Sequence, residues 1–228
     1  MKLTRVEEVA TGTSAYYFER PASFSFVPGQ FVEVLLEDDS PADSVRSFSI
    51  ASSPSEPDLM FATRSRDSAF KLALRSLSPG RDVEIDGPYG SLALRTDAGL
   101  PHVFIAGGIG ITPFRSILVE AAAAGSQEPM VLFHANRDVA GAAFFSEMTY
   151  LGQRSPAFRF IPTLTRPSPG WEGETGYIDA AMLRRHLDPA QAVYYVSGPL
   201  AMVEATLALL GSIGVPGDRV RSETFEGY

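Results

Sequence analysis

The chain has 228 residues, of which 45% are hydrophobic and 20% charged, which is typical of a globular protein with one large domain or two ordinary ones. Its 27 acidic and 19 basic residues give a net charge of -8, which disfavours general binding to nucleic acid or to an anionic membrane. It contains no cysteine, so disulfides, thiolate catalysis and iron–sulfur clusters are excluded and any redox chemistry must use a bound cofactor. The histidines His102, His134 and His186 are far apart and show no metal-ligand spacing, so we expect no metal site.

The N-terminal residues include charged side chains and no apolar segment typical of a signal peptide, so we expect a cytoplasmic protein. The apolar stretch at residues 102–114 is interrupted by three glycines and a proline and is too short to span a bilayer. We therefore expect no membrane insertion.

Residues 1–97 are expected to form an antiparallel β-barrel domain. Short strand-like runs, separated by turn residues, occur at residues 15–18, 31–36, 47–51, 59–63 and 83–85. One helix is predicted at residues 68–77, with Ser68 at its N-terminal end.

Residues 98–228 are expected to form an α/β domain with a five-stranded, parallel, doubly wound sheet. Near-continuous apolar strands at residues 103–106, 130–134, 158–164, 193–196 and 219–225 alternate with helical segments at residues 113–124, 142–151, 179–187 and 200–210. The predicted junction between the two domains lies at residues 95–100.

A glycine-rich turn follows the first strand of this α/β region, at residues 107–113 (Gly-Gly-Ile-Gly-Ile-Thr-Pro). We expect Thr112 to cap the next helix and Pro113 to lie in its first turn. Small residues let the backbone approach a pyrophosphate, and the helix N-terminus offers free N–H groups. The alternative is a tight strand–helix turn that binds nothing.

The strand at residues 46–49 (Arg-Ser-Phe-Ser) places Arg46 and Phe48 on one face and Ser47 and Ser49 on the other. One face thus combines a phosphate-binding guanidinium with an aromatic ring, and the other offers hydroxyls. By itself this pattern also fits an ordinary half-buried strand.

Five motifs in this order resemble those of the ferredoxin–NADP reductase superfamily, and the resemblance covers essentially the whole chain. Residues 46–49 are similar to its Arg-x-Tyr/Phe-Ser flavin motif, and residues 28–31 (Pro-Gly-Gln-Phe) to its Pro-Gly-Gln-Tyr/Phe. Residues 87–90 (Gly-Pro-Tyr-Gly) resemble its Gly-Pro-x-Gly turn, and residues 107–113 its nucleotide loop. Residues 197–199 (Ser-Gly-Pro) stand where the family usually has Cys-Gly-Pro.

The resemblance implies a flavin on the barrel and a nicotinamide nucleotide on the sheet. Arg46 would bind the FAD pyrophosphate, and Ser68 would cap its helix against the phosphates. Phe48 would pack on one side of the flavin, and Phe225 would cover the other flavin face. Ser49, Ser197 and Glu223 would be the catalytic residues. The full set of expected cofactor-binding residues is Arg46, Ser47, Phe48, Ser49, Ser68, Gly107, Gly108, Gly110, Thr112, Pro113, Asn136, Arg137, Gly198, Pro199 and Phe225.

Two departures from the family pattern affect these expectations. Ser197 replaces the usual cysteine beside the nicotinamide, which leaves activity possible and is expected to slow hydride transfer. Three residues follow Phe225, so Tyr228 could take its stacking role. We favour Phe225 because Glu223 lies two residues before it, which is the family spacing.

The coenzyme is expected to be NADPH or NADH. The second strand of the α/β region ends in Asn136, Arg137 and Asp138, and an arginine suits a 2′-phosphate whereas an acid suits a ribose hydroxyl. Arg137, with Arg166 as a second candidate, slightly favours NADPH.

These features predict an FAD-dependent NAD(P)H oxidoreductase that passes single electrons to a small carrier such as ferredoxin or flavodoxin. The alternatives are the NADH-dependent reductase component of an oxygenase system and a non-catalytic redox sensor subunit. A basic cluster in the barrel half could dock an acidic carrier, or it could be a set of scattered surface charges of which some bind the FAD phosphates. Its members are Arg64, Arg66, Lys71, Arg75 and Arg81.

Overall fold

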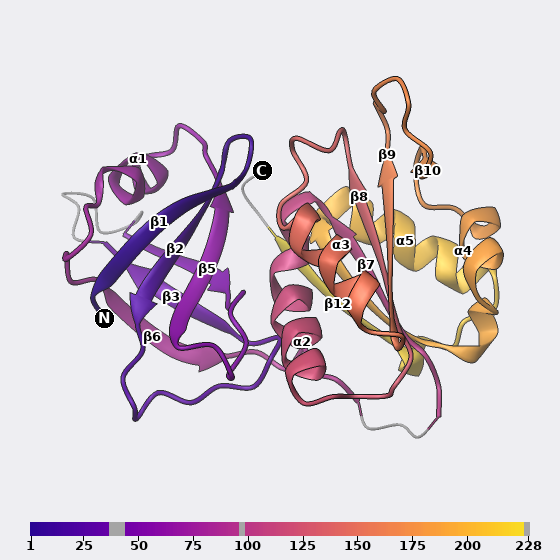
Figure 1. Ribbon diagram of the computed structural model, residues 1–228, viewed down its shortest axis with the longest axis horizontal. Coiled ribbons are helices and arrows are strands. Elements are labelled where there is room, and N and C mark those ends of the chain that lie inside the picture. The colour runs from indigo at the N-terminus through magenta and orange to yellow at the C-terminus, as the bar shows by residue number, and fades with distance from the viewer. Residues whose placement is uncertain (37–43, 96–98, 226–228) are drawn as a thin grey trace. The chain divides into compact units, whose positions relative to one another are not determined.

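The computed structural model describes residues 1–36, 44–95 and 99–225, which form two compact units (Figure 1). The first unit contains Met1–Leu94 and Thr112–Ala123, and the second contains Arg95–Ile111 and Ala124–Tyr228. The boundary predicted between residues 97 and 98 lies outside the described residues. Among the described helices, none has the length and hydrophobicity needed to cross a membrane.

The first unit is built from two three-stranded antiparallel sheets. One has the order β1 (Leu3–Ala10), β2 (Thr13–Glu19), β5 (Asp58–Arg64), and the other the order β4 (Val45–Ser49), β3 (Phe31–Leu35), β6 (Glu84–Tyr89). This confirms the predicted antiparallel barrel-like architecture. The sequence patterns did not predict β1, because it is an edge strand whose only fully buried side chain is Leu3.

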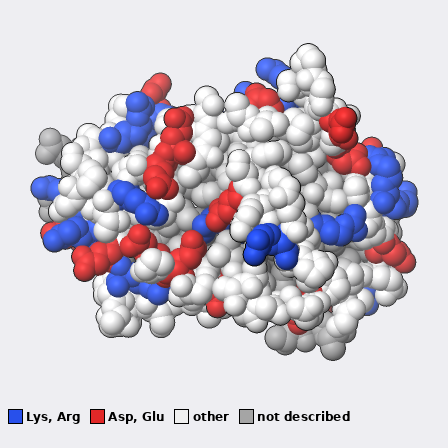
Figure 2. Space-filling view, in the orientation of Figure 1, with Lys and Arg blue, Asp and Glu red and all other residues white. Residues whose placement is uncertain are grey.

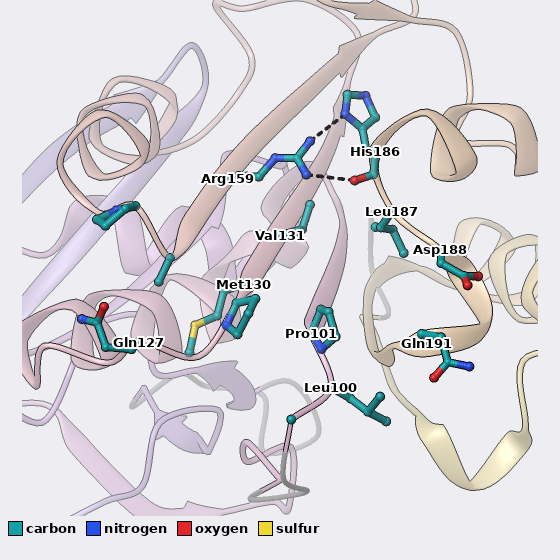
Figure 3. A pocket seen from close by; sticks show the side chains of 14 residues that line it. Leu100, Pro101, Gln127, Met130, Val131, Arg159, His186, Leu187, Asp188 and Gln191 are labelled. Atoms are coloured by element: carbon teal, nitrogen blue, oxygen red, sulfur yellow. Dashed lines mark hydrogen bonds between the residues drawn. The ribbon is translucent and has the colours of Figure 1, made fainter.

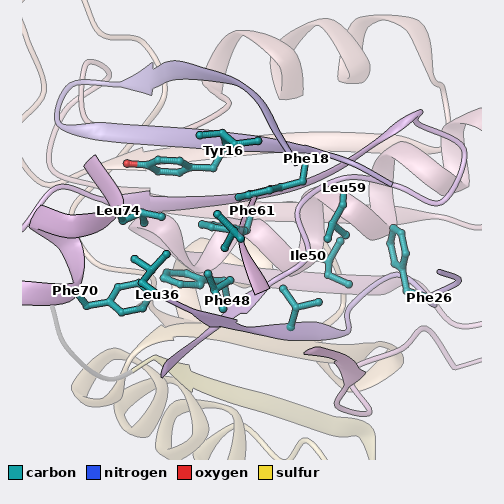
Figure 4. Packing of buried hydrophobic residues seen from close by; sticks show 14 residues of the cluster. Tyr16, Phe18, Phe26, Leu36, Phe48, Ile50, Leu59, Phe61, Phe70 and Leu74 are labelled. Atoms are coloured by element: carbon teal, nitrogen blue, oxygen red, sulfur yellow. The ribbon is translucent and has the colours of Figure 1, made fainter. Parts of the chain in front are cut away.

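A stack of aromatic rings fills the core between these sheets (Figure 4). Phe61 of β5 lies 4.4 Å from Phe48, 5.4 Å from Phe18 and 5.5 Å from Tyr16, measured between ring centroids. Burying each such ring contributes roughly 1.5–3 kcal/mol. Helix α1 (Ala69–Ser76) packs Phe70 and Leu74 onto the same core.

Helix α2 (Thr112–Ala123) belongs to the first unit although it follows a strand of the second. The Arg115 guanidinium, 5% exposed, donates to the Ala51 carbonyl at 2.7 Å and to both carboxylate oxygens of Glu56 at 2.8 and 3.0 Å. Ser116 Oγ donates to the Ser52 carbonyl at 2.7 Å. These contacts fix α2 to the segment that connects β4 and β5.

The second unit is a six-stranded parallel sheet. Its order is β10 (Glu174–Thr175), β9 (Phe158–Leu164), β8 (Met130–Asn136), β7 (His102–Gly107), β11 (Val193–Pro199), β12 (Val220–Phe225). The parallel sheet is confirmed, but the predicted number of five strands was wrong. The extra strand β10 has only two residues, too few to give a strand pattern in the sequence.

Helices cover both faces of this sheet, as the doubly wound prediction requires. The buried side chains of α4 (Ala180–His186) and α5 (Leu200–Ser212) share a core with alternate residues of β7, β8 and β11. Helix α3 (Phe145–Arg154) lies on the other face, where Phe145 contacts Phe160 edge-on (Figure 1). Central strands buried on both faces explain the continuous apolar runs in the sequence.

Helix α3 begins three residues later than predicted. Asp138 Oδ1 accepts a hydrogen bond from the Gly141 N–H at 2.8 Å and so holds a turn there. Phe144 then adopts a left-handed backbone conformation with φ of 58°, which keeps residues 142–144 out of the helix.

We predict that Glu56→Gln lowers the free energy of unfolding by about 1–3 kcal/mol at pH 7, because Arg115 then lacks its charged partner. Burial alone would raise the pKa of Glu56, but hydrogen bonds and charge from Arg115 outweigh it and hold the pKa below 4.5. The wild-type advantage should therefore be present above pH 4.5 and disappear as the pH falls through the lowered pKa.

Urea unfolding of the wild type, Glu56→Gln and the exposed control Glu204→Gln at several pH values measures this effect. Equal unfolding midpoints for wild type and Glu56→Gln at pH 7 would show that the ion pair does not hold α2.

Candidate functional site

Strand β4 has the alternation predicted from the sequence. The Arg46 guanidinium carbon lies 5.7 Å from the centre of the Phe70 ring, and the Phe48 ring lies 5.9 Å from the same ring, so Arg46 and Phe48 share one face. Ser47 is exposed, whereas Ser49 is 4% exposed. The Ser49 hydroxyl has no hydrogen-bond partner among the described residues.

Phe48 is more deeply buried than a flavin-covering side chain needs to be. It is 8% exposed, and one ring face stacks on Phe61 with an interplanar angle of 13°. Its packing role in the barrel core is therefore substantial, and its role beside a flavin stays a prediction.

Ser68 caps α1, as the sequence predicts. Its hydroxyl accepts a hydrogen bond from the Lys71 N–H at 3.3 Å, and its backbone is extended, as is usual for a residue that precedes a helix. The first turn of α1 contains no acidic residue. The positive end of the helix dipole is therefore not neutralised by a side chain of that turn.

The glycine loop of the second unit is tightly packed against the end of β11. Strand β7 ends at Gly107, a 3-10 turn spans Gly108–Ile111, and α2 begins at Thr112. A Cβ atom on Gly110 would lie 2.3 Å from the Ser197 carbonyl oxygen, so only glycine permits this approach. Thr112 was predicted as the N-cap but is the first helical residue, because the preceding turn continues directly into the helix.

A buried histidine supports this loop from the neighbouring strand. His134 of β8 is fully buried, and its Nε2 lies 2.8 Å from the Gly108 carbonyl oxygen. The sequence did not indicate that its partner would be the glycine loop, because the two residues are 26 positions apart.

Ser197 and Glu223 are brought together by the register of β11 and β12, in which they are paired residues. Ser197 is fully buried, and neither its hydroxyl nor Glu223 Oε2 has a hydrogen-bond partner in the described part of the chain. Burial raises the pKa of Glu223 to about 7. The pair therefore offers a hydroxyl beside a carboxyl group that exchanges its proton near neutral pH.

The next residues of the same two strands complete this edge of the sheet. Gly198 pairs with Thr224, and Pro199 pairs with Phe225, which is partly buried. Tyr228, the alternative stacking residue, lies outside the described residues.

Asn136 and two arginines lie at the carboxyl ends of β8 and β9. Asn136 is 7% exposed, and both polar atoms of its side-chain amide lack a partner among the described residues. The Arg166 N–H donates to the Arg137 carbonyl at 2.7 Å, so these arginines leave adjacent strands side by side, with both side chains exposed. The structure thus brings together residues that the sequence offered as separate candidates.

A hollow of about 630 Å³ lies at the opposite edge of this sheet, beside the amino ends of β7, β8 and β9 (Figure 3). Arg159 crosses it and donates to the His186 carbonyl at 2.9 Å. None of the predicted site residues lines this hollow. Its size is therefore weaker support for a site than the convergence of buried polar groups at the carboxyl edge.

The predicted site residues fall into two sets. Arg46, Ser49 and Ser68 belong to the first unit, and Ser197 and Glu223 to the second. Each set is ordered by contacts within its own unit. Lys71, a member of the basic cluster identified in the sequence, packs over the Phe48 ring in the first set.

Comparison with known proteins extends these observations. Residues 104–207 match the oxidoreductase NAD-binding domain family. The reductase component of propane 2-monooxygenase from Gordonia sp. (strain TY-5) is 30% identical over 212 residues, which cover 90% of this chain and 60% of that protein. The chain therefore spans only about 60% of the length of that relative.

Two further matches extend over nearly the full length of both proteins. The fold of a ferredoxin NADP+ reductase from Neisseria gonorrhoeae superposes with a TM-score of 0.84 at 22% identity, covering 98% of this chain and 96% of the other. Ferredoxin–NADP reductase B from Sorangium cellulosum is 31% identical over 238 aligned positions, covering 99% of this chain and 96% of the relative. With the two-unit fold and the motif order described above, this similarity shows that the chain belongs to the ferredoxin–NADP reductase family.

Proposed function

We propose that this protein is an FAD-dependent NAD(P)H oxidoreductase that delivers electrons to a protein acceptor. The observation that carries the proposal is a set of buried polar atoms, Ser49 Oγ, Ser197 Oγ and Glu223 Oε2, that have no hydrogen-bond partner among the described residues. Folded proteins rarely leave buried polar groups unpaired, and such groups mark places where a ligand supplies the missing partner.

The residues of the first unit fit FAD. Arg46 supplies a guanidinium for the pyrophosphate, Ser68 and the N-terminus of α1 supply further anion contacts, and Ser49 supplies a hydroxyl for the flavin edge. The exposed Ser47 lies on the same β4 strand. Phe48 orders this strand through the core.

The residues of the second unit fit a nicotinamide nucleotide. The glycine loop offers backbone N–H groups to phosphates through Gly107, Gly108 and Gly110. Thr112 and Pro113 begin helix α2, which is assigned to the first unit. Thr112 offers a further N–H group, and Pro113, which has none, fixes the backbone of the first helical turn. The Asn136 amide can donate and accept hydrogen bonds at once, which suits the polar edge of a bound nucleotide. Gly198 and Pro199 line the edge beside Ser197.

When bound, FAD and the nicotinamide supply the reaction itself, in which hydride passes from nicotinamide C4 to flavin N5 before electrons leave for the acceptor. The protein contributes orientation and proton control. Ser49 and Ser197 offer hydroxyls that can donate or accept. Glu223 holds a proton on its carboxyl group below about pH 7 and releases it above. Phe225 provides an aromatic side chain that covers the flavin until the coenzyme arrives.

The adjacent arginines Arg137 and Arg166 support NADPH over NADH. Two exposed guanidinium groups from neighbouring strand ends can bind a 2′-phosphate from two sides. A ribose hydroxyl offers no charge for either group.

A ferredoxin or flavodoxin is the acceptor that we propose first. The similarity to propane 2-monooxygenase reductase supports a second candidate, in which the chain serves an oxygenase system. The redox-sensor alternative has no comparable support. We propose a cytoplasmic location for either carrier-linked function.

The flavin site and the proposed reaction can be tested together on the purified protein. Purified protein supplied with FAD should be yellow, and its flavin absorbance should bleach when NADPH or NADH is added under argon. A protein that binds FAD but bleaches with neither coenzyme would refute the proposed reaction, and a protein that binds no FAD would refute the flavin site.

Glu223→Gln should abolish the pH dependence of flavin reduction near pH 7, because the amide mimics the protonated carboxyl group and cannot titrate. Above pH 8 the variant and wild type should differ by about 10-fold or more. Stopped-flow reduction rates between pH 5.5 and 9 measure this, with Ser222→Ala on the exposed side of β12 as the control. An unchanged pH profile in Glu223→Gln would rule out the proposed proton role.

Arg137→Ala should raise the KM for NADPH on the order of 10-fold and leave that for NADH nearly unchanged, because a charged hydrogen bond to the 2′-phosphate is lost. Arg166→Ala should act in the same direction, and Arg184→Ala, on α4, should change neither value. Equal effects of Arg137→Ala on both coenzymes would contradict a 2′-phosphate site.

A further inference from the structure

Lys71 occupies a position that disfavours a positive charge. It is the third residue of α1, where the helix dipole is positive and acidic side chains are usual. Its ammonium nitrogen lies 5.5 Å from the centre of the Phe48 ring, and the side chain is only partly exposed. Burial, followed by repulsion from Arg66 and Arg46, lowers the pKa of Lys71 to about 8.

The groups around Lys71 do not neutralise it. Its amine donates to the Thr63 hydroxyl and, at 3.3 Å, to the Arg64 carbonyl, both on β5. Arg46 on β4 and Arg66 in the segment before α1 are the charges that act on it. In the described part of the chain, no carboxylate pairs with Lys71.

The cations of β4 and α1 are held against one pair of aromatic rings. Phe48 and Phe70 lie side by side (Figure 4), with Lys71 over the Phe48 ring and Arg46 over the Phe70 ring. A residue that conflicts with the preference of its local structure, and whose conflict no neighbouring group offsets, is often a functional residue. Here a compact anion with more than one negative charge would offset the positive charges of Lys71 and Arg46.

We propose that Lys71 binds the diphosphate of FAD together with Arg46, and that it is the residue by which this barrel favours FAD over riboflavin. This inference rests on the proposed flavin function and singles out Lys71 from the basic cluster, in which the sequence did not distinguish the phosphate-binding members from the surface charges. The diphosphate carries adjacent negative charges, which two cations on different elements can share.

A docking surface for an acidic carrier is the competing explanation for the same charges. Such a surface keeps its cations exposed and hydrated, as Arg66 and Arg75 are. The Lys71 amine instead contacts Thr63 and the Phe48 ring. On the face shown in Figure 2, basic and acidic side chains are interspersed over the barrel rather than gathered into one basic area.

Lys71 also makes flavin binding dependent on pH. Arg46, Arg64 and Arg66 are the charged groups that face Lys71, and the lowered pKa of Lys71 lies near 8. Diphosphate binding requires the protonated amine, and FAD affinity should therefore fall as the pH rises through 8.

The test compares FAD and riboflavin binding to the full-length apoprotein by quenching of flavin fluorescence. Lys71→Met should raise the Kd for FAD on the order of 10- to 100-fold and leave the Kd for riboflavin unchanged, because riboflavin has no phosphate. Wild-type FAD affinity should weaken several-fold from pH 7 to pH 9, whereas Lys71→Arg should bind FAD well at both values.

Arg75→Met is the matched control, because it removes the same charge from the last turn of the same helix. It should leave FAD binding within about two-fold of wild type, within the effect of an exposed charge. Wild-type FAD affinity in Lys71→Met, or equal losses for FAD and riboflavin, would overturn the proposal. A Lys71→Met protein that binds FAD normally but has a raised KM for its carrier would show a docking role instead. Failure of the wild type to bind FAD would overturn the proposed function itself.

Discussion

The course of the chain depends on the hydrogen bonds and the ion pair that the buried Arg115 guanidinium makes. This guanidinium joins α2 to the Ala51 carbonyl and the Glu56 carboxylate of the barrel, although α2 directly follows the glycine loop of the parallel sheet. The chain thus enters the barrel unit at Thr112 and leaves it after Ala123. Removing one partner of such an ion pair is costly because the other charge stays buried, so this connection is a fixed part of the barrel.

The buried polar groups around Arg115 and those of the candidate site differ in how fully they are hydrogen-bonded. The two Nη atoms of Arg115 donate to the Ala51 carbonyl and to the Glu56 carboxylate at distances of 3.0 Å or less. At the carboxyl edge of the sheet, the Ser197 hydroxyl, Glu223 Oε2 and the Asn136 amide are shielded from water and have no such partner in the part of the chain that the structure describes. Structural polar groups are satisfied by the fold, whereas groups that await a ligand are satisfied on binding. The same reasoning applies to Lys71 in the barrel, for which we propose an anion as the partner.

The sequence predicted the architecture well because the spacing of apolar residues and the composition of each segment determine the type of helix or strand that it forms. Continuous apolar runs required a parallel sheet with both faces covered, and Ser68 was identified from its capping chemistry alone. The sequence did not predict strand β1, because most side chains of this edge strand are exposed to solvent. It did not predict β10, because two residues are too few to show an alternating pattern. In the site, the motifs named Ser197 and Glu223, but their adjacency depends on strand register. The environment of Lys71 depends on Phe48 and Arg46 from another element, which no local pattern encodes.

The central claim is that this chain moves hydride from a nicotinamide to a flavin. Single-turnover flavin reduction under argon tests it most directly, with NADPH or NADH, whichever reduces the flavin faster, and with the same coenzyme carrying deuterium at both C4 positions. The account predicts complete bleaching with both forms of the coenzyme, slower with the deuterated form, because breaking the C4–hydrogen bond is part of the observed step. Bleaching at the same rate with both forms at saturating concentration, or no bleaching at all, would contradict it.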